Sequence, residues 1–150
     1  APGTARLDPA TRALADVPVG SAVHARGRYL GRIERKGSSA CAASRLTDRG
    51  HVVSVRWSGG ERDGGADLRA IGAGAFEFVA GETPPAAAAE VRLRTTGGRG
   101  LTQPDLIVGR AVRDGAAWRM TARAAWPQDV AAAAFIFEDE RLRLVGARRP

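Results

Sequence analysis

Apolar and polar residues alternate in short runs along most of this chain. Clusters of Gly, Asp and Arg separate the runs at intervals of about 8 to 12 residues, a pattern typical of all-β proteins. We therefore predict an all-β domain, a barrel or a sandwich of roughly nine or ten short strands. The ten predicted strands are Gly20–Ala25, Tyr29–Arg35, Ala40–Leu46, His51–Ser58, Asp67–Ile71, Ala75–Ala80, Glu90–Thr95, Leu106–Arg113, Ala117–Ala124 and Arg141–Val145.

The same alternation predicts which side chains face the core, because successive residues of a strand point to opposite sides. In the segment from His51 to Ser58 the odd-numbered side chains share one face, and Arg56 lies on the other. In the segment from Ala117 to Ala124, Trp118 and Met120 are expected to point inward. The residues expected to be buried are Val53, Val55, Trp57, Leu93, Val108 and Trp118.

A short helix is predicted near the N-terminus. Asp8 is suited to cap a helix over Ala10–Asp16, Pro9 fits its first turn, and Pro18 follows its end. We therefore divide the chain into a helix and lead-in over residues 1–19 and a β domain over residues 20–150. A chain of 150 residues fits a single domain.

Two segments do not fit one class of structure. Glu82–Ala89 contains two prolines and four alanines, which suits a linker or a loop with a helical turn. Val130–Glu140 contains an alanine run that favours helix, but Phe135 and Phe137 alternate as in a strand. So short a run is ambiguous by periodicity alone.

The charge of the chain favours an anionic partner. Lys36 is the only lysine among 23 basic residues, the other 22 are arginine, and the net charge is +7. The preference for arginine, together with abundant Ala and Gly, also fits a GC-rich coding bias. The excess of positive charge attracts nucleic acid, acidic lipid or an acidic protein face, and charge alone does not choose among them.

Other compositional features limit the possible chemistry. Cys41 is the only cysteine, so no internal disulfide forms. His24, Cys41 and His51 show no metal-binding spacing, so structural roles are expected, without a metal or a cofactor. No apolar run approaches the ~20 residues of a membrane span, and we expect a soluble chain. The start Ala1-Pro2-Gly3, without Met, fits export or organelle targeting after removal of a presequence, or trimming of a longer chain.

One stretch resembles a known family. The segment Cys41–Ser58 reads CAASRLTDRGHVVSVRWS. It is similar to the strand-turn-strand that delivers the catalytic histidine in trypsin-like serine proteases, where "Val-Val-Ser" leads into Ala-Ala-His-Cys. Here Trp57 stands where the general base would be, and Ser58 stands where the cysteine paired with Cys41 would be.

The resemblance extends to about residues 36–112 and implies one six-stranded barrel. Asp105-Leu106-Ile107-Val108 is similar to the strand that carries the family's catalytic aspartate. The motif Gly-Asp-Ser-Gly-Gly-Pro is absent, and the 150 − 105 = 45 residues after Asp105 are too few for a second barrel. The resemblance therefore implies a degenerate barrel without the catalytic His and Ser. The alternative is a set of unrelated strands in which Trp57 is an ordinary core residue.

Arginines recur at alternate or fourth positions on the predicted strands, where each pair shares a face. The candidates for a basic binding surface are Arg92, Arg94, Arg119, Arg123, Arg141 and Arg143. A solvated outer face is the alternative. No exposed aromatic side chain is evident for stacking bases, which favours a protein over nucleic acid as the partner.

The sequence thus predicts a protein that acts without catalysis. The first hypothesis is a binding or structural protein on a degenerate trypsin-like barrel. The second is a basic accessory subunit that docks on a larger assembly or on nucleic acid through its arginine-bearing strands. An enzyme with an unrecognised pocket is the third. The partner's identity, the compartment and the oligomeric state do not follow from the sequence.

Overall fold

The computed structural model describes residues 4–7, 19–25, 27–36, 41–97, 102, 104–122, 133–138 and 141–147. These residues form twelve strands and no helix. The strands are β1 (Thr4–Leu7), β2 (Ala22–Ala25), β3 (Arg28–Lys36), β4 (Cys41–Arg45), β5 (Val52–Gly59), β6 (Arg62–Gly72), β7 (Ala75–Gly81), β8 (Glu90–Thr95), β9 (Ile107–Asp114), β10 (Ala117–Ala122), β11 (Ala133–Glu138) and β12 (Arg141–Ala147). The all-β prediction is confirmed.

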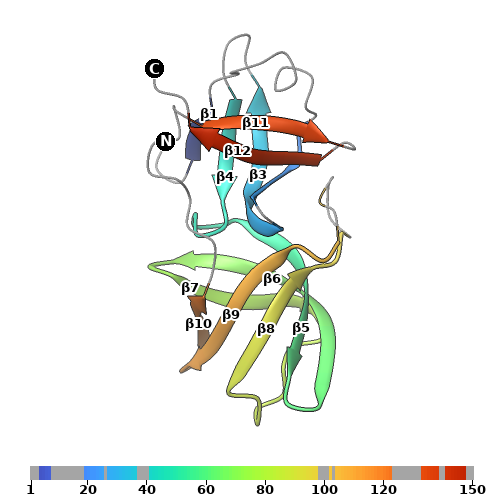
Figure 1. Ribbon diagram of the computed structural model, residues 1–150. Helices are drawn as coiled ribbons and strands as arrows, with labels where there is room; N and C mark the ends of the chain where they lie inside the picture. The colour runs from blue at the N-terminus through green and yellow to red at the C-terminus, as the bar shows by residue number, and fades with distance from the viewer. Residues whose placement is uncertain are drawn as a thin grey trace.

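Strands β5 to β10 close into a six-stranded antiparallel barrel, the lower part of Figure 1. Its strands follow one another in the order β5-β6-β7-β10-β9-β8, and β8 pairs again with β5. The last of the six barrel strands in the sequence, β10, closes the barrel because it pairs with both β7 and β9. A closed barrel leaves no strand edge unpaired.

The remaining strands extend this sheet beyond the barrel. β3 pairs with β4 and β2, β4 pairs with β1, and β12 joins β2 to β11. The link to the barrel is a short parallel pairing in which Arg28 of β3 lies beside Ile107 of β9. There the backbone N–H of Ile107 donates to the carbonyl oxygen of Gly27 over 2.8 Å.

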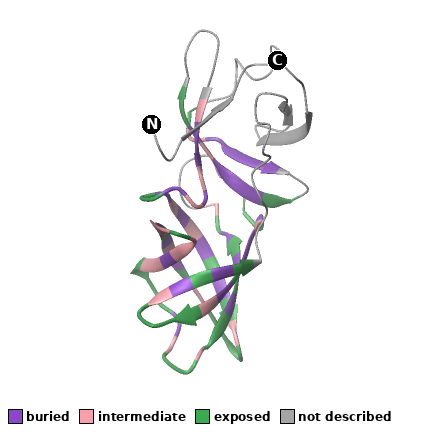
Figure 2. Ribbon diagram, turned by 90° about the vertical axis from the view of Figure 1, so that its left-hand side faces the viewer, coloured by how far each residue is buried: buried purple, intermediate pink, exposed green. Residues whose placement is uncertain are grey.

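β5 and β8 bury every second side chain. Buried and exposed residues alternate along strands of the barrel in Figure 2. The interior holds Trp57, Leu68, Phe76, Leu93 and Trp118. The predicted facing is confirmed, because all six residues expected in the core are at most 4% exposed and Arg56 is exposed. Met120 is also buried, as expected.

Trp57 is held in the barrel by its shape and by one hydrogen bond. Its side chain is 1% exposed, and its indole N–H donates to the carbonyl oxygen of Glu82 over 2.6 Å. Across the ladder stands Gly64, where an added Cβ would lie 2.6 Å from the indole ring. The glycine therefore provides the room for the indole, and the indole anchors the start of the loop between β7 and β8.

The structure resolves the two ambiguous segments. Glu82–Ala89 is a loop with a turn at residues 86–87. Residues 133–138 form strand β11, so the phenylalanine alternation rather than the alanine run indicates the structure there. The strand β1 was not predicted, and the helix predicted over residues 10–16 lies outside the described residues.

The position of the barrel in the sequence differs from the prediction. The resemblance places it over residues 36–112, whereas the six strands run from Val52 to Ala122. β4, which contains the Cys41–Ser44 match, pairs with β3 and β1 rather than with β5. The densest part of the resemblance therefore spans two regions of the sheet. No helix in the described part of the chain is long and apolar enough to cross a membrane.

Replacing Trp57 by Ala should lower the free energy of unfolding by about 3 to 5 kcal/mol, because it leaves a large cavity and an unpaired carbonyl at Glu82. Urea denaturation followed by circular dichroism measures the change. Val79→Ala is the control, since Val79 is 40% exposed and should lose little. A loss in Trp57→Ala no larger than in this control would contradict the packing described.

Candidate functional site

Arginines from four strands lie side by side on the outside of the barrel. Arg94 of β8 stands directly opposite Arg56 of β5 on one side and Ile107 of β9 on the other. Arg28 of β3 lies beside Ile107 and completes this first row. In the next row Arg92 of β8 stands opposite Arg110 of β9. We call Arg28, Arg56, Arg92, Arg94 and Arg110, all exposed, the arginine face.

The arginine face is poorly neutralised. Arg110 forms an ion pair with Glu90 at 3.1 Å, and Arg94 donates to the backbone carbonyl of Asp105 over 3.3 Å. Within the described ranges, Arg28, Arg56 and Arg92 have no acidic side chain at ion-pair distance. Like charges placed directly opposite on neighbouring strands destabilise a sheet. The face therefore carries a repulsion that an anion would relieve.

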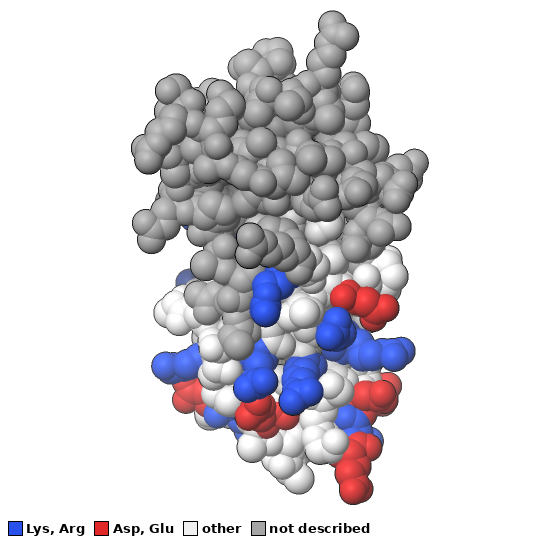
Figure 3. Space-filling view, viewed as in Figure 1, with Lys and Arg blue, Asp and Glu red and all other residues white. Residues whose placement is uncertain are grey.

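Three other arginines of the barrel have partners for their charge. Arg69 pairs with Glu77, and Arg119 pairs with Asp114 at 2.6 Å. The guanidinium of Arg113 lies 4.4 Å from the ring centre of Trp118. Figure 3 shows basic side chains gathered over β8 and β9, with acidic side chains around the margin. The arginine face thus differs from the rest of the barrel surface.

Four of the five arginines line a groove with a volume of about 330 Å³. Arg28, Arg92, Arg94 and Arg110 form its sides. Gly109 also lines it, with a φ of 152° that favours glycine, and it follows an irregularity in the β8–β9 ladder. A bulge with a glycine is a common way to open space beside a strand. The groove therefore has four positively charged side chains around it.

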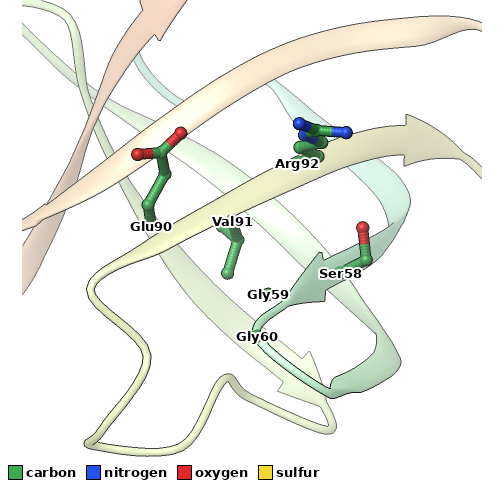
Figure 4. Close-up of a pocket in the computed structure, with 6 residues that line it drawn as sticks. All are labelled: Ser58, Gly59, Gly60, Glu90, Val91 and Arg92. Atoms are coloured by element: carbon green, nitrogen blue, oxygen red, sulfur yellow. The ribbon is translucent and has the colours of Figure 1, made fainter.

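A second hollow, of about 430 Å³, lies between the start of β8 and the end of β5 (Figure 4). Its side chains are those of Ser58, Glu90, Val91 and Arg92, and two glycines at residues 59–60 complete its lining. Figure 4 shows Glu90 and Arg92 standing on the same side of β8, with Val91 on the other. Arg92 lines both hollows: the second hollow lies on the β5 side of β8, and the groove lies on its β9 side. Together they flank β8 from Glu90 to Arg94, and we call this stretch the track.

Of the six predicted site residues, the structure places Arg92 and Arg94 together. Arg92 and Arg94 lie in the arginine face, whereas Arg119 on β10 is two strands away and paired with Asp114. Arg141 and Arg143 lie on β12, outside the barrel, and only their backbone is described. Arg123 lies outside the described residues.

Sequence reasoning missed Arg28, Arg56 and Arg110. The outward direction of Arg56 followed from the alternation in its strand, and Arg110 lies inside a predicted strand. The alternation within one strand does not predict the register between β5, β8 and β9. This register places Arg56 beside Arg94 and Arg110 beside Arg92.

A buried polar chain connects β3, β4 and the start of the barrel. The imidazole of His51 is hydrogen-bonded to the hydroxyl of Ser44 through Nδ1 at 2.7 Å and to the hydroxyl of Tyr29 through Nε2 at 2.8 Å. All three side chains are buried. Arg32 of β3 adds a hydrogen bond of 2.7 Å to the carbonyl oxygen of Val52. This chain attaches the β3–β4 hairpin to the barrel.

The Ser44 hydroxyl beside the His51 imidazole is also the arrangement of a nucleophile and its general base in hydrolytic enzymes. Burial, with a smaller contribution from the positive charge of Arg32, lowers the pKa of His51 to about 3. An imidazole with this pKa is a weak base. Burial also raises the pKa of the Tyr29 hydroxyl. Ser44 is 8% exposed, so its hydroxyl is hardly accessible to a substrate. This burial favours a structural role for the hydrogen-bonded Ser44, His51 and Tyr29.

The two residues at positions that the resemblance marks as catalytic differ in their surroundings. Trp57 is buried in the barrel core, and Asp105 is an exposed turn residue with a φ of 64° just before β9. Among the residues whose side chains are described, no group of three His, Cys, Asp or Glu side chains is arranged to hold a metal ion.

Comparison with protein-family models, with curated proteins and with solved structures finds no match for this chain. The functional interpretation therefore depends on the site itself.

The stability of the fold should decrease as the pH falls from about 6.5 toward 3, because in this window the unfolded chain protonates His51 and the folded chain does not. Each pH unit costs at most about 1.4 kcal/mol. Urea denaturation at neutral and mildly acidic pH measures the loss, and His51→Gln, which keeps a hydrogen-bonding side chain, should lose about 1 kcal/mol less per unit. Equal pH dependence in both proteins would contradict the assignment.

Proposed function

We propose that this chain is a non-catalytic binding module that docks an anionic partner through the arginine face of its barrel. The observation that carries the proposal is the groove lined by Arg28, Arg92, Arg94 and Arg110. Guanidinium groups form paired hydrogen bonds to carboxylates and phosphates, and several together discriminate strongly for anions.

The position of these arginines on a rigid support favours binding over simple solubility. Arg92, Arg94 and Arg110 project from hydrogen-bonded strands of a closed barrel, and Arg28 projects from β3, which pairs with β9. Their backbone positions are therefore fixed before a partner arrives. A preformed site loses less conformational entropy on binding than a flexible basic tail. Soluble surfaces normally mix charges of both signs, as the pairs Arg69–Glu77 and Arg119–Asp114 do.

A degenerate trypsin-like barrel is the finer architectural proposal. The closed six-stranded antiparallel barrel is compatible with it, and Trp57 at the expected position of the general base supports a role without catalysis. The second function, an accessory subunit docking on a larger assembly or on nucleic acid, uses the same face. The described aromatic side chains are buried or partly buried in the core, which favours protein over nucleic acid.

Replacing Arg92 and Arg94 together by Ala should weaken binding to a polyanion such as heparin by about tenfold or more at low salt. Affinity of the unchanged protein should fall steeply as salt rises, because electrostatic binding is screened. The control is the double variant Arg69→Ala with Arg119→Ala, which removes the same charge from ion-paired positions. Equal losses of affinity in both double variants would mean that binding depends on net charge alone, which would contradict the proposal.

The chain should be silent toward a fluorophosphonate probe, which labels serines activated by a neighbouring base. The reason is that Ser44 is buried and His51 is a weak base. Mass spectrometry after incubation of the folded protein measures labelling, with an active serine hydrolase as the positive control. Labelling of any serine in the folded protein would overturn the non-catalytic assignment.

A further inference from the structure

We infer that the arginine face holds an extended acidic segment of a protein, with acidic side chains at alternate positions, running along β8. The inference rests on the proposed function and names its partner. It follows from the spacing of the charges, the shape of the track and the kind of side chain around it.

The spacing of the arginines along β8 is that of an extended chain. Arg92 and Arg94 are two residues apart on one strand, and such residues lie about 7 Å apart on the same face. A peptide in the same extended conformation repeats its own alternate side chains at this distance. Two acidic residues separated by one residue therefore match the two arginines without strain in either chain.

Each of these two arginines has a second cation beside it. Arg56 stands opposite Arg94, and Arg110 stands opposite Arg92. An acidic side chain above either position meets two guanidinium groups rather than one. Because a carboxylate has two oxygens, it can accept from both.

The shape of the surface favours a linear occupant. The two hollows share Arg92 and flank β8 on its two sides from Glu90 to Arg94, a length of about 14 Å for five residues of strand. Ile107, which is half-buried, gives the groove an apolar contact between Arg94 and Arg28. A track of this shape fits a short extended peptide whose alternate side chains point toward the barrel surface.

The track has opposite character at its two ends. Glu90 lies at one end and forms an ion pair with Arg110, while the charged side chains that line the other end, Arg94 and Arg28, are both basic. An acidic segment should therefore place its acidic residues toward Arg94 and a neutral or basic residue beside Glu90. This asymmetry would give the segment a direction.

Nucleic acid fits these observations less well. Its recognition as a single strand combines basic grooves with exposed aromatic platforms on which bases stack. The large described apolar side chains that are exposed are Val19 and Val79, and neither is aromatic. The face offers charged contacts at the spacing of a peptide and no exposed aromatic side chain among the described residues.

The test compares two labelled peptides that have the same composition and net charge. One repeats Asp-Ser, so that all Asp side chains of the extended chain share one face. The other repeats Asp-Asp-Ser-Ser, so that no two Asp residues are separated by a single residue. Fluorescence anisotropy at low salt should give affinity for the alternating peptide on the order of 3- to 10-fold higher.

Three variants connect this preference to the track. Arg94→Gln should remove the preference between the peptides, and the matched control Arg69→Gln should retain it. Glu90→Gln should tighten binding of the alternating peptide, because it removes the carboxylate from the track and its hold on Arg110. All three positions are exposed or partly exposed, and circular dichroism checks that the fold is retained.

The outcomes separate the inference from the proposed function. Equal affinity for the two peptides, lost together in Arg92→Ala with Arg94→Ala, would overturn the extended segment and leave the anion-binding face intact. Tighter binding of polyuridylate than of either peptide would also overturn it, in favour of nucleic acid. Absence of binding to every polyanion at low salt would overturn both.

Discussion

Closure of the barrel by β10 is the constraint on which the rest of the structure depends. β10 follows β9 in the sequence but also pairs with β7, so six strands form one continuous ladder. Once the ladder is closed, every strand must direct one set of side chains inward and the other outward. The inward set, with Trp57 and Trp118, forms a dense core, and the outward set is placed in fixed rows.

The arginine face is a consequence of those rows. Its arginines are far apart in the sequence, from residue 28 to residue 110, but the register of β5, β8, β9 and β3 brings them together. Packing of the core fixes that register, because a slip of one residue would turn the apolar side chains outward. The stability of the interior therefore maintains a concentration of positive charge that the surface alone would disfavour.

The buried chain of Ser44, His51 and Tyr29 has a different task. It satisfies polar groups at the place where the β3–β4 hairpin meets the barrel, where apolar packing alone would leave hydroxyls without partners. Arg28, at the start of β3, reaches the arginine face from this hairpin. The polar junction thus contributes to the position of one side of the groove. β3 therefore carries both a residue of the buried polar junction, Tyr29, and a residue of the arginine face, Arg28.

The sequence by itself determined ten of the twelve described strands and the faces of those in the core. Alternation gave all ten predicted strands and the burial of Trp57 and Trp118, because the side-chain period of a strand is a local property of the backbone. Only the tertiary structure decided which strands are neighbours. It set Arg92 and Arg94 beside Arg56 and Arg110. It also placed Arg119 on another part of the surface, in an ion pair with Asp114, and it placed β4 outside the barrel. Register and strand order depend on contacts between distant residues, and no local pattern records them.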